Sequence, residues 1–222
     1  MKQTIYSIYI KRILDVCAAL LVMVLFCWLY AIIALLVKIN MGSPVIFKQE
    51  RPGQAEKIFT IYKFRTMNYE KDKYGNDLPD TERLNDFGIA LRKASLDEIP
   101  EILNILKGDM SFIGPRPLPI IYLSYYSERE RKRHVMKPGL TGLAQVNGRN
   151  AITWEEKFGF DLQYLDNISF ALDAKIFLKT IAIVLKKADI GQAEEAPISL
   201  HVLRRERDED EYCWEKSDTK SN

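Results

Sequence analysis

Two adjacent carboxylates, Asp97 and Glu98, are the residues of this 222-residue chain best suited to chemistry. They stand just before Pro100, and because proline is tolerated in the first turn of a helix, we place both carboxylates at a helix start. Free N–H groups and the helix dipole stabilise anions there, so we expect low pKa values. Such anions suit a nucleophile and a magnesium ligand better than a general acid.

A purely structural interpretation of these carboxylates is also open. Aspartate at a helix start is most often a simple cap, and Ser95 to Glu98 fits the pattern of a capping box. The two interpretations differ in what the side chains contact, which the sequence does not show.

An arginine enclosed by prolines follows the two acids. Pro115 and Pro117 restrict the backbone around Arg116, so less conformational entropy is lost when its guanidinium binds a ligand. A planar fork of donors fits phosphate oxygens in a bidentate way. The alternative is a proline-stiffened turn whose arginine faces solvent.

Other cations are candidates for the same phosphates. Lys63 and Arg65 alternate onto one face of an expected strand, Arg92 precedes Asp97 by five residues, and Arg149 lies in a glycine-rich region. Any one of these could be structural. As a group with two acids, they suit magnesium-assisted attack on a diphosphate.

The remaining pattern predicts a mixed α/β fold, mostly helical with short strands. There is no long alternation of strands and helices. The expected elements are strands at 45–47 and 58–64, a surface loop at 68–86, and helices at 97–107, 118–133 and 174–187. The last helix is amphipathic, so it could lie in a membrane interface or face the core.

An apolar segment at 13–39 precedes all of these elements. As a helix it would be about 40 Å long, enough to cross a bilayer with tilt. Basic residues flank both of its ends, which favours both ends in the cytosol and therefore a re-entrant helical hairpin. The segment contains no proline to mark a bend and carries Cys27 and Trp28 in its middle. An ordinary single-span anchor is the alternative.

Composition divides the chain into three parts. We expect a membrane-inserted helix at 1–40, a cytosolic catalytic domain at 41–192 and a polar, disordered tail at 193–222. The net charge of +2 gives no signature of nucleic-acid binding. The three cysteines and two histidines have neither disulfide nor zinc-site spacing.

The chain resembles the bacterial sugar transferases, the monotopic phosphoglycosyl transferases that initiate glycoconjugate synthesis. The resemblance spans residues from about 5 to 190, and its most specific part is the block from 95 to 117. The matching stretches are Lys11-Arg12 with Asp15, KQERPG at 48–53, IYKFRTM at 61–67, SLDEIPEILNILKGDMSFIGPRP at 95–117 and KPGLTGLAQVNGR at 137–149. Relatives commonly carry Ser-Pro where this chain has Cys27-Trp28.

The resemblance implies a two-step reaction. Asp97 would attack the sugar-bearing phosphate of a UDP-sugar, releasing UMP and leaving an aspartyl phospho-sugar. Undecaprenyl phosphate, or another polyprenyl phosphate, would then take the phospho-sugar. Glu98 would hold Mg²⁺, and Arg116 would steady the phosphates with Arg92 nearby.

Other implied site residues have less specific roles. Lys63, Arg65, Gln145 and Arg149 match motif positions, and Asp173 matches an acidic position before the last amphipathic helix. The run at 147–158 is similar to that of enzymes acting on a diacetamido-trideoxy sugar of the bacillosamine type.

The resemblance also implies a location and partners. The enzyme would lie at the cytoplasmic face of the bacterial inner membrane, in contact with its lipid, and would supply downstream glycosyltransferases. A rival hypothesis is a non-catalytic membrane scaffold that binds lipid phosphate. A kinase is disfavoured because the chain has neither a phosphate-binding P-loop nor a G-x-G-x-x-G turn.

Overall fold

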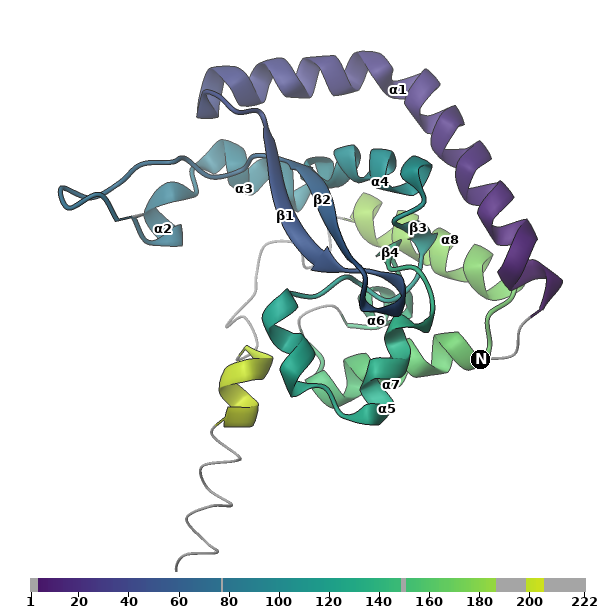
Figure 1. Ribbon diagram of the computed structural model, residues 1–222. Helices are drawn as coiled ribbons and strands as arrows, with labels where there is room; N and C mark the ends of the chain where they lie inside the picture. The colour runs from purple at the N-terminus through teal and green to yellow at the C-terminus, as the bar shows by residue number, and fades with distance from the viewer. Residues whose placement is uncertain (1–3, 77, 149–150, 187–198, 206–222) are drawn as a thin grey trace, which may run out of the picture.

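One long bent helix arches over the rest of the molecule (Figure 1). The computed structural model describes residues 4–76, 78–148, 151–186 and 199–205. Helix α1 (Lys11–Met41) follows a π-helical turn, η1 (Tyr6–Ile10). By length and composition, η1 and α1 together could cross a membrane. Residues 23–28 in the middle of α1 are all exposed, so its apolar face has no partner there.

Both ends of α1 pack against the same globular body. Near its start, Arg12 donates to the carbonyl of Leu106 (3.0 Å), and Asp15 accepts the Phe112 N–H (3.2 Å). Near its end, Val37 is fully buried in a cluster with Phe64. The two ends are therefore held on one body while the middle projects away from it.

The helix bends at Phe26, where the backbone leaves helical geometry (φ −116°, ψ 16°). This bend directly precedes Cys27 and Trp28, so it forms without proline. The structure has one continuous bent helix rather than the two antiparallel legs of a hairpin (Figure 1).

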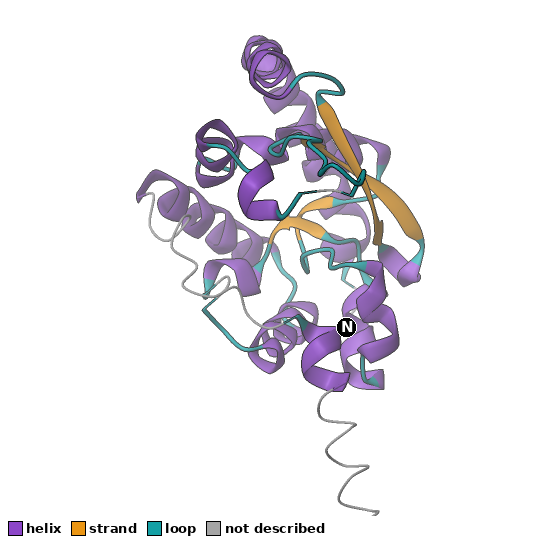
Figure 2. Ribbon diagram, turned by 90° about the vertical axis from the view of Figure 1, so that its left-hand side faces the viewer, coloured by secondary structure: helices purple, strands orange, loops and turns teal. Residues whose placement is uncertain are grey.

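Two small two-stranded sheets lie beneath the arch (Figure 2). Strands β1 (Ile46–Pro52) and β2 (Ile58–Phe64) form an antiparallel hairpin, and β3 (Ser111–Ile113) pairs in parallel with β4 (Gly139–Thr141). Gly139 must lack a side chain, because a Cβ there would lie 2.1 Å from the backbone nitrogen of Gly114. This close approach brings the segment that carries Arg116 against β4.

Helices and helical turns make up most of the remaining structure. In chain order they are η2 (Gln54–Glu56), α2 (Asp80–Arg83), α3 (Asp86–Lys93), η3 (Leu96–Glu101), α4 (Ile102–Lys107), η4 (Ile120–Tyr125), α5 (Glu128–Arg131), η5 (Lys132–Val135), α6 (Leu143–Val146), α7 (Trp154–Asp166), α8 (Phe170–Lys186) and a helical turn at 200–205. The predicted mixed fold, mostly helical with short strands, is confirmed.

Several predicted elements differ from the structure in detail. The strand at 58–64 is confirmed, whereas the preceding strand runs on to Pro52. The single helix expected over 118–133 is wrong, because Ser127 and Glu130 form a capping box that starts α5 as a separate helix. The loop expected at 68–86 contains α2.

Helices α3, α6 and α7 have no counterpart among the predicted helices. Helix α3 is capped by Asn85, and α7 by a capping box between Thr153 and Glu156. The sequence Thr-Trp-Glu-Glu at 153–156 carries the signal for α7, so that start was readable.

The expectation of a disordered tail at 193–222 is wrong for the part that the structure describes. Residues 200–205 are helical, and Leu200 is fully buried in an aromatic cluster with Trp154 and Phe158. Arg204 forms an ion pair with Glu130 (2.6 Å). Residues 193–198 and 206–222 of that tail lie outside the described residues.

Candidate active site

The two carboxylates lie in the first turn of η3, a 3₁₀ helix. Ser95 precedes the turn with a left-handed backbone (φ 55°), and its side chain makes no capping hydrogen bond. Asp97 and Glu98 follow as the second and third residues of η3, and Pro100 lies inside it. The capping-box interpretation is therefore wrong, and the carboxylates have other contacts.

Glu98 joins two cations from different elements. Its Oε1 accepts from Lys63 Nζ (2.6 Å), on β2, and from an Nη atom of Arg116 (2.7 Å), in the loop after β3. Burial alone would raise the pKa of this carboxyl, but Arg116 and Lys63 hold it well below its usual range. The expected low pKa is confirmed for Glu98.

Asp97 has the opposite electrostatics. Burial and the neighbouring Glu98 raise its pKa, although Lys63, Arg116 and Arg92 partly oppose this. The low pKa expected from a helix start is thus wrong here, because shielding from water outweighs the effect of a short helical turn. No hydrogen bond to the Asp97 carboxylate is found among the described residues, so its oxygens are free to react.

Sequence reasoning missed a third acid in this group. Glu101 is only 2% exposed, and its Oε1 lies 3.1 Å from Lys63 Nζ. Burial and the nearby Glu98 raise its pKa. Its spacing, one turn after Asp97, was visible in the sequence, but its burial was not.

A hydrogen bond from a second arginine fixes the backbone at Arg116. Arg133 donates to the Arg116 carbonyl (2.8 Å) and forms a fully buried ion pair with Asp161 (2.7 Å). The Arg116 side chain is 45% exposed. A rigid backbone with a reachable guanidinium is the arrangement that phosphate binding requires.

One large cavity unites most of the predicted site residues. Its volume is about 1170 Å³, and Asp97 and Glu98 both line it. Predicted residues that also line it are Lys63, Arg65, Arg92, Arg116 and Gln145. Arg149 lies outside the described residues, so its predicted role is not tested.

Two of these residues, Arg65 and Arg92, are partly committed to the scaffold. Arg65 donates to the carbonyls of Met41 and Ser43, which ties the end of α1 to the cavity. Arg92 donates to the Thr66 hydroxyl (2.9 Å). Gln145, in contrast, has a buried side-chain oxygen without a hydrogen-bond partner.

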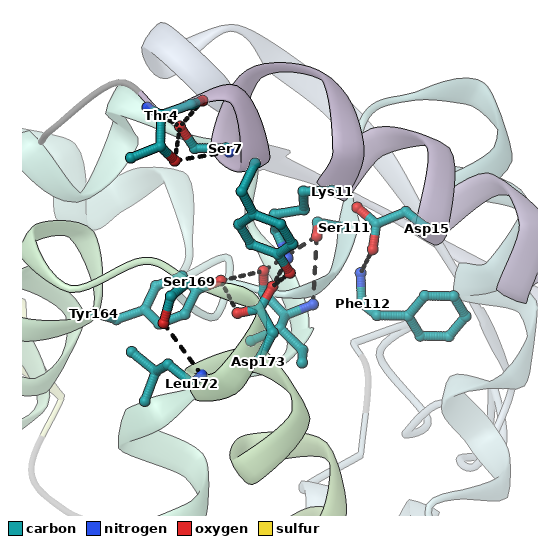
Figure 3. A network of polar contacts seen from close by, with 12 residues as sticks. Thr4, Ser7, Lys11, Asp15, Ser111, Phe112, Tyr164, Ser169, Leu172 and Asp173 are labelled. Atoms are coloured by element: carbon teal, nitrogen blue, oxygen red, sulfur yellow. Dashed lines mark hydrogen bonds and ion pairs between the residues drawn. The ribbon is translucent and has the colours of Figure 1, made fainter.

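Asp173 is the one predicted site residue that the structure places elsewhere. It is buried, and it does not belong to the described residues that line the cavity. Its carboxylate accepts from Lys11 (2.7 Å), Tyr6 (2.6 Å) and Tyr164 (2.6 Å), as Figure 3 shows for the labelled Lys11 and Tyr164. Every donor around Asp173 belongs to the scaffold, so these contacts do not support the substrate-binding role, which stays a prediction.

The residues present fit a divalent cation only in part. Among the described residues, no three histidines, cysteines or acids are grouped to hold a metal. Magnesium in proteins is usually held by one or two carboxylates together with substrate phosphates. Glu98, beside Asp97 in a cavity lined by cations, meets that smaller requirement.

Comparisons with known proteins indicate a single family. The family model for bacterial sugar transferases matches residues 6–187. The uncharacterized sugar transferase EpsL of Bacillus subtilis is 50% identical over 183 residues, which cover 82% of this chain and 91% of that protein.

Two more distant relatives have names that state a reaction. The UDP-glucose:undecaprenyl-phosphate glucose-1-phosphate transferase of Caulobacter vibrioides is 40% identical, over 79% of this chain and 69% of its own length. The UDP-N-acetylgalactosamine-undecaprenyl-phosphate N-acetylgalactosaminephosphotransferase of Aeromonas hydrophila is 37% identical, over 80% of this chain and 44% of its own length.

Proposed function

This chain belongs to the bacterial sugar transferase family, and from that membership we propose that it moves a sugar-1-phosphate from a UDP-sugar to undecaprenyl phosphate, releasing UMP. The printed names of the relatives from Caulobacter vibrioides and Aeromonas hydrophila describe reactions of this kind. The observation that carries the proposal is a shielded carboxylate, Asp97, which accepts no hydrogen bond from the described residues and lies in a cavity lined by Lys63, Arg92 and Arg116.

The reaction proceeds in two displacements at one phosphorus atom. An Asp97 oxygen attacks the phosphorus that bears the sugar, the bond to the bridging oxygen breaks, and UMP leaves with that electron pair. A phosphate oxygen of the lipid then attacks the same phosphorus, which releases the Asp97 carboxylate. Atoms balance, since UDP-sugar and lipid phosphate become UMP and lipid diphosphate sugar.

The pKa of Asp97 is raised rather than low as expected, and the role of nucleophile then rests on the carboxylate being shielded and lacking hydrogen bonds from the described residues. A carboxylate that burial disfavours as an anion is more reactive toward phosphorus than one stabilised by hydrogen bonds. Arg116 and Lys63 would shift from Glu98 toward the developing charge on the diphosphate. Glu98 would hold Mg²⁺ together with the donor phosphates, and the ion would supply charge neutralisation there.

The exposed apolar middle of α1 supports membrane insertion. We propose that the bent helix enters the bacterial inner membrane from its cytoplasmic face and returns, so that both ends stay on one side. In a cysteine-free background, single cysteines near residue 3 and at exposed Lys71 should both resist an impermeant reagent in intact cells. Labelling near residue 3 alone would favour the single-span anchor.

The candidate donors fall into two classes of sugar. Names of relatives include glucose and N-acetylgalactosamine, whereas the run at 147–158 favours a diacetamido-trideoxy sugar. The lipid product, which stays in the membrane, would pass to downstream glycosyltransferases.

The test is UMP release by detergent-solubilised protein with Mg²⁺, undecaprenyl phosphate and a panel of UDP-sugars that includes diacetamido sugars. We expect release with one donor, abolished by chelation of Mg²⁺ and by Asp97→Asn. Folded protein that releases no UMP with any donor would instead support the rival scaffold that binds lipid phosphate.

A further inference from the structure

The geometry points to the place where the acceptor lipid chain binds. We propose that the first isoprenoid units of the polyprenyl phosphate lie in the apolar end of the cavity, between α1 and α8. This inference rests on the proposed function, because it assigns the second substrate of the same reaction.

The cavity is larger than one small substrate needs. Its volume of about 1170 Å³ exceeds the range of about 300–1,000 Å³ that is usual for a small-molecule site. Two substrates must reach Asp97 in turn, and they differ sharply in polarity. A cavity of this size suits two subsites that share one nucleophile.

The cavity is lined by residues of two chemical kinds. Tyr122, Trp154 and Lys157 are aromatic or charged and suit a nucleotide sugar. Val22, Phe112 and Leu140 are apolar and pack against one core cluster, and Phe177 and Val184 add apolar side chains from α8. We call these five residues the apolar part of the cavity, which offers a hydrocarbon only van der Waals contact.

Two hydroxyls that line the cavity are already hydrogen-bonded within the protein. The hydroxyls of Thr141 and Thr180 lie 2.9 Å apart, and Thr180 donates to the Ile176 carbonyl (2.9 Å). A prenyl chain could therefore pass these two residues without leaving their hydroxyls unpaired.

The same two helices connect this part of the cavity with apolar surface. On α8, Phe177 is 48% exposed, and Leu178, Ile181 and Leu185 are also exposed. On α1, Val22 lines the cavity next to a stretch of exposed apolar residues. A chain from the bilayer could thus follow apolar side chains into the cavity, while its phosphate reaches the cations near Asp97.

A matched pair of substitutions on α8 tests this assignment. Val184 lines the cavity, whereas its neighbour Leu185 is exposed and does not. We expect Val184→Trp to raise the KM for undecaprenyl phosphate at least about tenfold, because the larger side chain would fill the apolar part of the cavity. Leu185→Trp should leave that KM unchanged, and both variants should bind anionic vesicles equally.

A half-reaction separates the acceptor subsite from the chemistry. Exchange of labelled UMP into the UDP-sugar, measured without lipid, needs Asp97 but no acceptor. We expect Val184→Trp to retain this exchange. Equal acceptor KM values for Val184→Trp and Leu185→Trp, with exchange retained, would overturn the inference.

Other outcomes also give a decision. If the unsubstituted protein is folded and shows no exchange, the proposed function and this inference fail together. If Val184→Trp loses exchange, the milder pair Phe177→Ala and Leu178→Ala decides. Only Phe177→Ala should raise the KM for a long polyprenyl phosphate relative to a short one, and equal effects would overturn the assignment.

Discussion

Two clusters of acids and cations in this molecule use the same residue types for different ends. In the cluster of Figure 3, Asp173 accepts three hydrogen bonds, from Lys11, Tyr6 and Tyr164. In the cavity, Glu98 holds two cations while Asp97 beside it accepts no side-chain hydrogen bond from the described residues. The Asp173 carboxylate is therefore occupied by donors from the protein, whereas the Asp97 carboxylate is available to a substrate.

The difference teaches how to separate scaffold from site. A buried carboxylate whose donors all come from the protein fixes several elements together, here η1 and the start of α1 against α7 and α8. A shielded carboxylate without donors costs stability, so such a group is a candidate functional residue. The sequence alone presents both simply as acids within a family motif.

Substitution at Asp97 should have the largest effect on activity. We expect Asp97→Asn to lower turnover by at least about 10³-fold, because the amide cannot attack phosphorus. The pKa of Asp97 is raised, so its surroundings disfavour the charge, and the neutral amide should not destabilise the fold at pH 7. Turnover assays with urea unfolding check both parts. If Asp97→Asn also unfolded the protein, Asp97 would be needed for the fold, and the contrast between the two clusters would fail.

Substitution at Asp173 should do the reverse. Asp173→Asn leaves the Lys11 ammonium buried without its ion-pair partner, which should cost about 3–5 kcal/mol of unfolding free energy. Adding Lys11→Met should restore part of that loss, because no unpaired charge then remains. The folded fraction should keep UMP exchange, and a specific loss of exchange would return Asp173 to the active site.

His134 is a buried ionisable residue outside the cavity lining, and we expect it to affect stability and not activity. Burial and Arg133 lower its pKa to about 4, while Glu56 opposes this from 3.6 Å. Between pH 6.5 and 4 the unfolded chain therefore binds more protons, so stability falls on acidification by about 3 kcal/mol. His134→Phe should remove this part of the acid sensitivity in urea unfolding at the two pH values. Unequal activities of the two proteins at pH 7 would contradict a purely structural role.

A smaller effect is expected at Arg116. Arg116→Lys keeps the charge but loses the planar fork, so the KM for the UDP-sugar should rise by roughly tenfold. Lys107→Arg, outside the cavity lining, is the control and should leave that KM unchanged. A change in stability rather than in KM would assign Arg116 to the scaffold.

The sequence predicted which acids and cations lie together better than it predicted their surroundings. The motifs around Asp97 and Arg116 identify the acids and cations that the cavity brings together, because they are close in sequence or part of one strand. Lys63 was found by strand alternation, which depends only on the backbone period.

What the sequence did not reveal depends on long-range contacts. The burial of Glu101, the network around Asp173 and the docking of Leu200 all involve segments distant in the chain. The bend of α1 at Phe26 has no proline to announce it. The residues of both capping boxes, in contrast, lie three positions apart in the sequence, so the starts of α5 and α7 could have been predicted from them.

The most direct test is to find the covalent intermediate. Protein incubated with Mg²⁺ and its UDP-sugar, without lipid acceptor, would be quenched, digested and analysed by mass spectrometry. We expect a phospho-sugar adduct on the peptide that contains Asp97, lost when undecaprenyl phosphate is added. An adduct on another residue, or no adduct from protein that turns over with lipid, would contradict Asp97 as the nucleophile.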